Sequence, residues 1–357
     1  MSAPMAMMLA GGTGGHVYPA LAVALDLRER GFRLAWVGTR RGLEARLVPD
    51  ADIRLYQLPM RGLRGKGPLQ QLLAVVLLGV SLLQSLWLML RLRPALVVGM
   101  GGYASFPAAF AAWLTRRPLL LQEQNAVPGS ANRALARFAT QIATGFPHVL
   151  EQYATATYLG NPVRKDLLSV ATDYPWAYEA GSPLRVLVLG GSLGARPLNE
   201  AVPAVAALLG TQCEWRHQCG PLHADTTRAD YASVSDARWC VEPYVEDMRE
   251  AYGWAQLVIC RAGALTVAEL AVTGRPSILI PLPYAIDDHQ TANARFLSEA
   301  GAAVLLPQSD LVGQLEATLR TLIADTGLLA GMAAAALECA RPDATCMIAD
   351  RGEALTR

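Results

Sequence analysis

The sequence predicts an α/β fold with two Rossmann-like, doubly wound domains, and three observations support this prediction. The chain has 357 residues, which is long for a single core and favours two domains. Short continuous apolar runs, typical of parallel strands that are buried on both faces, alternate with helix-like segments. A glycine-rich turn follows such a run near the N-terminus, and a similar turn recurs about half a chain later.

Four apolar runs end in glycine-containing turns that lead into helix-like patterns. The first run is MAMMLA, followed by GGTGG, and the second is PALVVG, followed by MGGYAS. The third is LRVLVL, followed by GGSLGA, and the fourth is AQLVIC, followed by RAGALTVAEL. Such alternation implies βαβ units with right-handed crossovers. The stretch YLGNPVRKDLL, in which Pro162 interrupts regular structure, is the expected connection between domains. We therefore expect a first domain over residues 1–163 and a second over residues 164–341.

Composition argues against several classes of protein. The net charge of +1 gives no field that would attract nucleic acid, so no nucleic-acid partner is expected. The six cysteines include no CxxC pair, which argues against zinc ribbons and thioredoxin-like sites. Most of them are interpreted as core residues of a reduced, cytosolic protein. The N-terminus has no signal-peptide pattern.

The glycine turns favour a nucleotide-type ligand. Glycine lets a ligand approach the backbone, and a helix N-terminus offers amide donors to a diphosphate, although a single turn of this kind can be purely structural. The GxGxxG fingerprint fails in the first turn, where Val17 takes the third place, and matches only formally in GMGGYA. Arg40 and Arg41, after the next strand, keep an NADP-dependent oxidoreductase as an alternative.

His16 follows the first turn directly, at the expected start of a helix. A histidine there can simply satisfy backbone groups. The positive end of a helix, however, favours neutral imidazole, which can accept a proton, so His16 is a candidate general base. His289, in IDDHQ, is a second candidate in an expected loop, whereas His148, His217 and His223 are interpreted as surface or structural residues.

No metal and no cofactor are expected. The sequence Asp50-Ala51-Asp52 has the Asp-x-Asp pattern that holds a diphosphate-bound metal in many sugar transferases, but it lies far from the glycine turns and is interpreted as a solvated loop. A leaving diphosphate would then be stabilised by helix N-termini and by hydroxyl donors such as Ser192.

Thr266 and Glu269 allow two interpretations. Their spacing is that of a helix capping box. The alternative is that the Glu269 carboxylate accepts hydrogen bonds from the vicinal hydroxyls of a ribose. Both roles could not easily be filled at once.

The segment 72–90, LLAVVLLGVSLLQSLWLML, approaches the length of a membrane span. It connects two strands that are expected to share one sheet, so we expect instead a helix with one face on the sheet and an exposed apolar face resting on a membrane. Arg91 and Arg93 at one end, and Arg61, Arg64 and Lys66 at the other, would meet anionic headgroups. An ordinary buried helix is the alternative.

Nine motifs in order closely resemble the bacterial N-acetylglucosaminyltransferases that convert lipid I to lipid II in peptidoglycan synthesis. They are GGTGGHVYPALAVA, WVGTRRGLEARLVP, GLRGKG, GMGGYAS, EQNAVPG, GNPVR, GGSLGA, CRAGALTVAEL and DDHQTANA. The resemblance implies the B-type glycosyltransferase fold, with two domains facing across a cleft. It implies inverting transfer of N-acetylglucosamine from UDP-N-acetylglucosamine to the C4 hydroxyl of lipid I, the undecaprenyl-pyrophosphoryl-MurNAc-pentapeptide.

The resemblance also implies where the substrates bind. The first domain would face the acceptor and an anionic membrane surface, a C-terminal helix near 342–357 would pack back on it, and the second domain would bind the UDP-sugar. The protein would be peripheral, at the cytoplasmic face of the inner membrane. The implied donor-binding residues are Thr13, Gly14, Gly15, Asn125, Arg164, Ser192, Val245, Ala264, Leu265, Thr266, Val267, Ala268, Glu269 and Gln290.

Among these residues, Ser192 is expected at the phosphates, the Val245 backbone at uracil and Glu269 at the ribose. Tyr103 and Glu123 are expected on the acceptor side. His289 stands where the family often has a glutamine. A UDP-N-acetylglucosamine epimerase of the same two-domain fold, and a non-catalytic membrane scaffold, remain alternatives.

Overall fold

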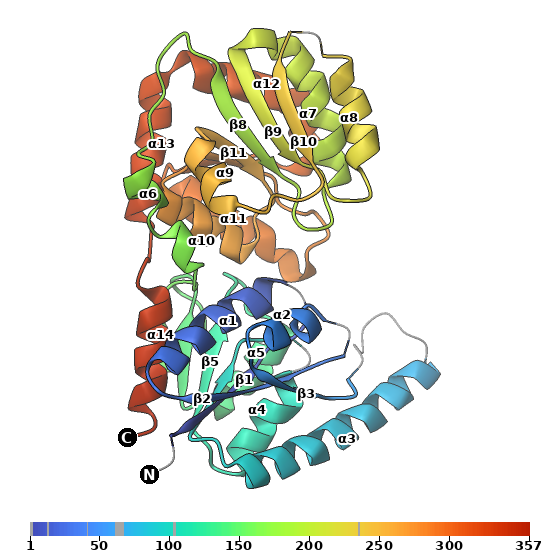
Figure 1. Ribbon diagram of the computed structural model, residues 1–357, viewed down its shortest axis with the longest axis vertical. Coiled ribbons are helices and arrows are strands. Elements are labelled where there is room, and N and C mark those ends of the chain that lie inside the picture. Colours follow the sequence, from blue (N-terminus) through green and yellow to red (C-terminus); the bar gives the residue numbers. More distant parts are fainter. Residues whose placement is uncertain (1–2, 13, 41, 61–67, 103–104, 235) are drawn as a thin grey trace. The chain divides into compact units, whose positions relative to one another are not determined.

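Figure 1 shows the computed structural model of the chain, which describes residues 3–12, 14–40, 42–60, 68–102, 105–234 and 236–357. The chain divides into two compact units. Unit 1 comprises Met1–Arg164 and Pro342–Arg357, and unit 2 comprises Lys165–Arg341. Each unit is a parallel sheet with helices on both faces, which is the Rossmann-like α/β architecture that the alternating runs predict.

The sheet of unit 1 has the order β3-β2-β1-β4-β5-β6-β7, with all neighbours parallel. Its strands are β1 (Met5–Leu9), β2 (Arg33–Gly38), β3 (Arg54–Gln57), β4 (Leu96–Gly99), β5 (Leu119–Glu123), β6 (Gln141–Thr144) and β7 (Ala156–Tyr158). The chain runs outward from β1 to β3 and returns to the other side of β1 with β4. Every residue of β4 and β5 is buried, which explains the apolar sequence of β4 and the three leucines that begin β5.

The helices of unit 1 are α1 (Gly14–Glu29), α2 (Glu44–Asp50), α3 (Pro68–Leu92), α4 (Ser105–Leu114), α5 (Ser130–Leu135) and α14 (Ala344–Ala354). The C-terminal helix α14 packs along α1, and its Ile348 and Ala349 belong to the same apolar cluster as Val17 and Ala20 of α1. Gly352 permits this close packing, because a Cβ atom there would lie 2.7 Å from Leu96 Cδ2.

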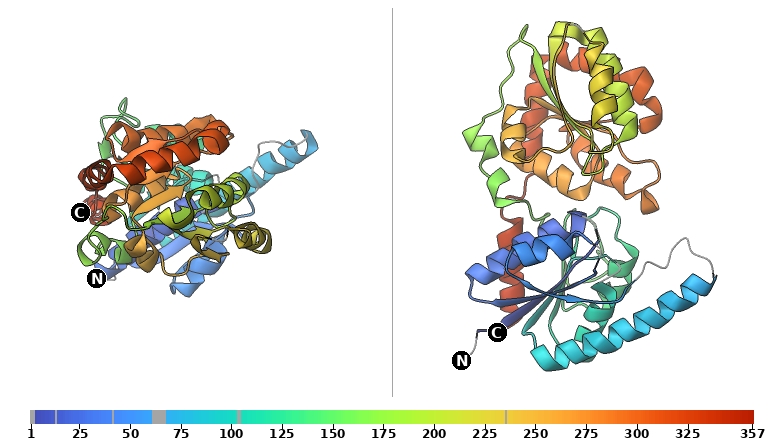
Figure 2. Two further views of the ribbon diagram at one scale, coloured as in Figure 1. Left: turned by 90° about the horizontal axis from the view of Figure 1, so that it is seen from above. Right: turned by 45° about the vertical axis from the view of Figure 1, so that its right-hand side comes forward.

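Helix α3 differs in one respect from the expectation. Its main packing partner is α4 and not the strands, although Gln84 Nε2 donates to the carbonyl oxygen of Gln57, the last residue of β3, at 3.2 Å. Figures 1 and 2 show its N-terminal part extending beyond α4. Only 28% of the apolar window in Leu73–Leu92 is buried, so the alternative of an ordinary buried helix is wrong. Arg61, Arg64 and Lys66 lie outside the described residues.

The sheet of unit 2 has the order β10-β9-β8-β11-β12-β13, again with all neighbours parallel. Its strands are β8 (Leu184–Leu189), β9 (Cys213–Gln218), β10 (Arg238–Glu242), β11 (Leu257–Cys260), β12 (Ser277–Leu279) and β13 (Ala303–Leu305). Its helices are α6 (Val170–Asp173), α7 (Arg196–Leu209), α8 (Ala224–Ala232), α9 (Met248–Trp254), α10 (Ala264–Thr273), α11 (His289–Glu299), α12 (Leu311–Ala324) and α13 (Thr326–Glu338).

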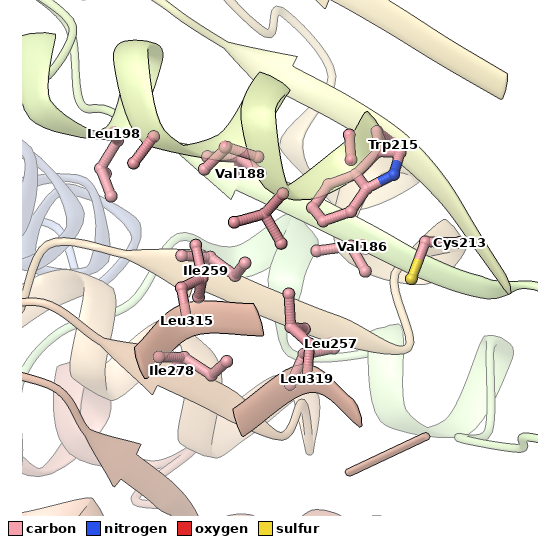
Figure 3. Close-up of a cluster of buried hydrophobic side chains, with 14 of the residues drawn as sticks. Val186, Val188, Leu198, Cys213, Trp215, Leu257, Ile259, Ile278, Leu315 and Leu319 are labelled. Carbon is pink, nitrogen blue, oxygen red and sulfur yellow. The ribbon is translucent and has the colours of Figure 1, made fainter. Parts of the chain in front are cut away.

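The core of unit 2 lies between the sheet and the layer formed by α7 and α12 (Figure 3). Alternate residues of the central strands, Val186 and Val188 of β8 and Leu257 and Ile259 of β11, face this layer. The cluster is completed by Leu198, Cys213, Trp215, Ile278, Leu315 and Leu319, all of them buried. This packing fixes the carboxyl ends of β8 and β11, where the glycine turns begin.

The cysteines are less uniformly buried than expected. Cys213, Cys219 and Cys260 are buried, and burial raises the pKa of the Cys213 thiol to about 12. Cys240 and Cys346 are exposed, so the interpretation as core residues holds for only part of the set. All of these cysteines are free thiols.

Candidate functional site

Each sheet places two glycine turns at the point where its strand order reverses. In unit 1, β1 and β4 are neighbours, and the turns begin at Ala10 and Met100. In unit 2, β8 and β11 are neighbours, and the turns begin at Gly190 and Arg261. All four predicted strands are therefore confirmed. Ligands of doubly wound folds bind beyond the carboxyl ends of the strands at this switch point, so each unit offers one candidate binding edge.

The two turns of unit 1 are packed against each other around the His16 ring. Gly101 and Gly102 have φ angles of +89° and +81°, which favour glycine. A Cβ atom at Gly101 would lie 3.2 Å from the His16 ring atoms, and one at Gly102 would lie 2.7 Å from the carbonyl oxygen of Gly11. Larger residues at these places would push the two turns apart.

His16 lies in the first turn of α1, half-buried, and its hydrogen bonds define its tautomer. Its Nδ1 lies 3.0 Å from the carbonyl oxygen of Met100 and 3.2 Å from Oε1 of Gln124. Gln124 Nε2 donates to the same Met100 oxygen at 2.7 Å, which fixes the orientation of the amide. Because both partners of Nδ1 are acceptors, Nδ1 carries the proton and Nε2 of the neutral ring is left as a proton acceptor. This is the tautomer that a general base requires.

A buried carboxylate that the sequence analysis did not single out holds the first turn. Glu44, the first residue of α2, is 0% exposed. Its Oε2 accepts a hydrogen bond from the Gly12 amide at 2.9 Å, and its Oε1 accepts from the Thr39 amide and hydroxyl at 2.8 and 2.7 Å. Gly42 leaves room for it, since a Cβ atom there would lie 1.9 Å from Oε2. The buried Glu44 side chain thus holds the first turn in place through these hydrogen bonds.

Glu123 organises the loop that carries Asn125. It ends β5 and is 2% exposed. Its carboxylate accepts from the backbone amides of Asn125 at 2.9 Å and Gly129 at 3.0 Å, and from Asn132 Nδ2 at 3.0 Å. Both oxygens are therefore engaged by the loop itself, and the group shapes the loop 124–129. Thr13 and Tyr103, which the resemblance places near the substrates, lie outside the described residues.

The switch point of unit 2 begins with the turn that contains Ser192. Ser192 is exposed between β8 and α7, and the N-cap residue Ala195 makes no side-chain capping bond. Gln218 Nε2 donates to the Gly191 carbonyl at 3.2 Å. Gly194 lies against the end of β9, because a Cβ atom there would lie 1.9 Å from the Cys219 carbonyl oxygen. These contacts hold the turn against the end of β9 and leave Ser192 exposed to solvent.

A buried histidine supports this turn. His217 of β9 is 0% exposed, and burial lowers its pKa to about 3. Asn199 donates to the Cys219 carbonyl at 2.9 Å, so its Oδ1 accepts from His217 Nε2 at 3.1 Å. His217 Nδ1 then accepts from the Tyr231 hydroxyl at 3.2 Å. The structural interpretation of His217 is confirmed, and the network ties α7 to the end of β9.

Helix α10 carries six of the residues that the resemblance assigns to the donor. Its N-cap is Gly263, which has no side chain to cap the helix, and Thr266 is the third residue of the helix and not its N-cap. The capping-box interpretation of Thr266 and Glu269 is therefore wrong. The side chains of Ala264 and Val267 are buried, whereas Leu265, Thr266, Ala268 and Glu269 are half-buried.

The Glu269 carboxylate is held by a residue of the neighbouring helix. Its Oε2 accepts a hydrogen bond from the Tyr252 hydroxyl at 3.0 Å. Tyr252 belongs to α9 and is 0% exposed. Nothing in the sequence pattern singled it out, since a tyrosine in an amphipathic helix is typical of a core residue.

The remaining predicted residues are spread over both units. Val245 is 3% exposed in the segment between β10 and α9. Gln290 lies in the first turn of α11, where its Oε1 accepts from the Leu282 amide at 2.9 Å. Arg164 is the last residue of unit 1, so it lies at the boundary and not in the second unit as expected. Asp50 and Asp52 are exposed, although Asp50 ends α2 and is not part of a loop.

Two family models match the chain. The model described as glycosyltransferase family 28 N-terminal domain matches residues 6–144, and the family 28 C-terminal domain matches residues 185–345. These segments contain β1 and β4 with their turns, and β8 and β11 with theirs.

The chain is similar to several curated proteins over nearly its whole length. It is 51% identical over 346 residues to the UDP-N-acetylglucosamine--N-acetylmuramyl-(pentapeptide) pyrophosphoryl-undecaprenol N-acetylglucosamine transferase of Alkalilimnicola ehrlichii, covering 96% of each chain. It is 49% identical to the protein of the same name from Thiobacillus denitrificans, covering 98% of each.

Solved structures agree with this likeness. The crystal structure of Acinetobacter baumannii MurG superposes with a TM-score of 0.84 at 39% identity, covering 98% of this chain and 99% of that one. A UDP-GlcNAc 2-epimerase from Neisseria meningitidis, bound to UDP-GlcNAc, has a TM-score of 0.65 at 14% identity, covering 97% and 99%. The second likeness concerns the fold alone.

Proposed function

The chain belongs to the family 28 glycosyltransferases, and we propose that it transfers N-acetylglucosamine from UDP-N-acetylglucosamine to the C4 hydroxyl of lipid I. The products are lipid II and UDP, and the reaction serves peptidoglycan synthesis. The observation that carries this proposal is the 51% identity, over 96% of both chains, to a protein named for this transfer. The epimerase alternative is supported only by a likeness in fold at 14% identity.

The tautomer of His16 supports its role as the general base. In the proposed step, the oxygen of the acceptor C4 hydroxyl attacks the anomeric carbon, and its proton passes to His16 Nε2. The bond from the anomeric carbon to the diphosphate breaks, and its electron pair stays on the β-phosphate oxygen of UDP. A single displacement of this kind inverts the anomeric centre and needs one base. Met100 and Gln124, which accept from Nδ1, would also stabilise the imidazolium that forms.

We propose that unit 2 holds the donor at its switch point. The charge that develops on the leaving diphosphate would be met by the Ser192 hydroxyl and by the amides at the start of α7. Glu269 would hold the ribose hydroxyls, the Val245 backbone would meet uracil, and Gln290 would contact the sugar. In unit 1, the turn with Gly14 and Gly15 and the loop with Asn125 would lie near the transferred sugar.

An exposed apolar stripe supports a membrane surface as the second partner. On α3, the exposed side chains of Val76, Val80, Leu83, Trp87 and Leu90 recur at intervals of three and four residues and so share one face of the helix. The neighbouring α4 adds two exposed side chains, Trp113 and Leu114. We call this set the α3 stripe. Four arginines lie at or just after the C-terminal ends of these two helices: Arg91 is the penultimate residue of α3 and Arg93 follows it, and Arg116 and Arg117 follow α4.

The α3 stripe fits a helix that rests on a bilayer. By length and composition, Leu73–Leu92 could cross a membrane. The strands before and after it, β3 and β4, lie in one sheet, so a crossing would separate strands that share that sheet. We therefore propose peripheral binding to the cytoplasmic face of the inner membrane, with apolar side chains inserted and arginines on anionic headgroups. The bent pair α12 and α13 passes the same test, but Leu315, Leu319 and Leu329 bury it in the core of unit 2.

The release of UDP tests the function. The protein is incubated with UDP-N-acetylglucosamine, with and without lipid I, and UDP is quantified while the sugar nucleotide is followed by proton NMR. The transferase predicts UDP release only when lipid I is present and no change in the sugar nucleotide alone. Conversion of the sugar to its C2 epimer without an acceptor would instead establish the epimerase.

A further inference from the structure

We infer that Tyr252 is a positioning residue for the donor ribose, because its hydroxyl holds the carboxylate of Glu269. This inference rests on the proposed function, in which Glu269 binds the ribose. The hydroxyl donates to Oε2 of Glu269 at 3.0 Å. Tyr252 is fully buried. A buried hydroxyl has lost its hydrogen bonds to water and needs a hydrogen-bond partner within the protein. A hydrogen bond to a carboxylate is also stronger than one between neutral groups.

A buried arginine holds the backbone of Tyr252, at the opposite end of the residue from its hydroxyl. Arg275 is 1% exposed. Its Nε donates to the Tyr252 carbonyl at 2.7 Å, and its Nη2 donates to the Tyr174 carbonyl at 2.6 Å. Burial lowers the pKa of Arg275 to about 10, which leaves the guanidinium charged at neutral pH. The backbone and the hydroxyl of Tyr252 are thus both anchored.

Two hydrogen bonds of Tyr252 connect α9 to α10 and to the residue that follows its C-cap. Glu269 and Arg275 belong to the same stretch of chain, because α10 ends at Gly274 in the left-handed conformation, with φ of +63°. This ending turns the chain at Arg275, whose guanidinium reaches the Tyr252 carbonyl, while the Tyr252 hydroxyl returns to Glu269. Two bonds at opposite ends of one tyrosine restrict both the position of α9 and the orientation of the carboxylate.

The same tyrosine connects two parts of the proposed donor site. Helix α9 begins three residues after Val245, at Met248, and Asp247 caps it by accepting from the Glu250 amide at 2.9 Å. The segment proposed to meet uracil therefore leads directly into the helix that holds the ribose carboxylate. A shift of Tyr252 would disturb the ribose contact first, because its hydroxyl bonds Glu269 directly.

The test measures how strongly the protein prefers UDP to 2′,3′-dideoxy-UDP, which lacks both ribose hydroxyls. Dissociation constants are measured by calorimetry on the full chain. The wild type should prefer UDP by about 10–100-fold, and Glu269→Ala should remove most of this preference. Tyr252→Phe, which keeps the ring and removes the hydroxyl, should reduce the preference by about 3–10-fold. Glu269→Asp, which keeps the charge but withdraws it from the Tyr252 hydroxyl, should reduce it as well.

Tyr231→Phe is the matched control. Tyr231 is equally buried in unit 2, but its hydroxyl bonds His217 and not Glu269. This variant should keep the wild-type preference even if its melting temperature falls as far as that of Tyr252→Phe. The inference is overturned if Tyr252→Phe keeps the wild-type preference while Glu269→Ala loses it. A full preference in Glu269→Ala would overturn the ribose assignment itself.

Discussion

Removal of one side chain from the α3 stripe should weaken membrane binding by a predictable amount. Complete burial of a leucine side chain contributes about 1.5–3 kcal/mol. Leu83 is 69% exposed, so transfer of its exposed part into a bilayer should contribute about 1–2 kcal/mol. Because about 1.4 kcal/mol changes an equilibrium tenfold, Leu83→Ser should weaken binding to vesicles by about 5–30-fold.

The assay is co-sedimentation with vesicles of phosphatidylethanolamine and phosphatidylglycerol, with the bound fraction measured against lipid concentration. Val312→Ser is the control, because Val312 is 84% exposed on α12 of unit 2, outside the α3 stripe. It should bind as the wild type does. The affinity of the wild type should also fall when phosphatidylcholine replaces phosphatidylglycerol or when salt is added, because the arginines near the C-terminal ends of α3 and α4 would lose their anionic partners.

Two results would refute the reasoning. If Leu83→Ser binds vesicles as tightly as the wild type, the α3 stripe does not enter the bilayer. If Val312→Ser loses as much affinity as Leu83→Ser, the binding is a general property of exposed apolar side chains and not of this surface.

Three further predictions concern single side chains. Gln124→Leu removes one acceptor from His16 Nδ1, so kcat should fall by about 2–10-fold with the donor dissociation constant unchanged; an unchanged kcat would show that Gln124 does not orient the base. Glu44→Gln places an NH2 group against amide donors, so the free energy of unfolding in urea should fall by about 1–3 kcal/mol, and no loss would contradict the contacts of this carboxylate. Because the pKa of His217 in the folded protein is lowered to about 3, the unfolded chain binds a proton below about pH 6.5 and the folded chain does not, so stability falls with acidification. Between about pH 7 and pH 5 this group should remove about 2 kcal/mol of unfolding free energy; urea titrations of His217→Gln should show a correspondingly shallower pH dependence, and an equal dependence would argue against a neutral buried imidazole.

The sheets and their turns could be predicted because their signals are local. Strands such as β4 and β8 are buried on both faces over most of their length, so nearly every position is apolar, and the glycine turns follow at once. His16 was found for the same reason, since it stands next to a glycine turn in the sequence. What the sequence could not show is which atoms of the ring are engaged, because Met100 and Gln124 lie far away along the chain.

The supporting residues escaped prediction because their partners are distant or their patterns have more than one interpretation. Glu44 is a charged residue at a helix start, which is typical of a solvated position, yet it is fully buried by contacts with Gly12 and Thr39. Tyr252 looks like a core residue, and its bond to Glu269 joins two helices. Thr266 and Glu269 have the spacing of a capping box, but the N-cap of the helix is Gly263.

The position of α3 shows a further limit. Its apolar character and exposure follow from composition, but its packing on α4 and not on the sheet depends on the order in which helices cover a face. The periodicity of apolar residues indicates which face of a helix is buried, but it does not indicate which element packs against that face.

The central claim is the transfer of one N-acetylglucosamine unit to lipid I, and the mass of the lipid product tests it most directly. Purified protein is incubated with UDP-N-acetylglucosamine and lipid I, the lipid is extracted, and its molecular mass is measured by mass spectrometry. We predict a gain of a single N-acetylhexosamine residue, with a β-linked anomeric proton by NMR. A lipid of unchanged mass after the sugar nucleotide has been consumed would contradict the account.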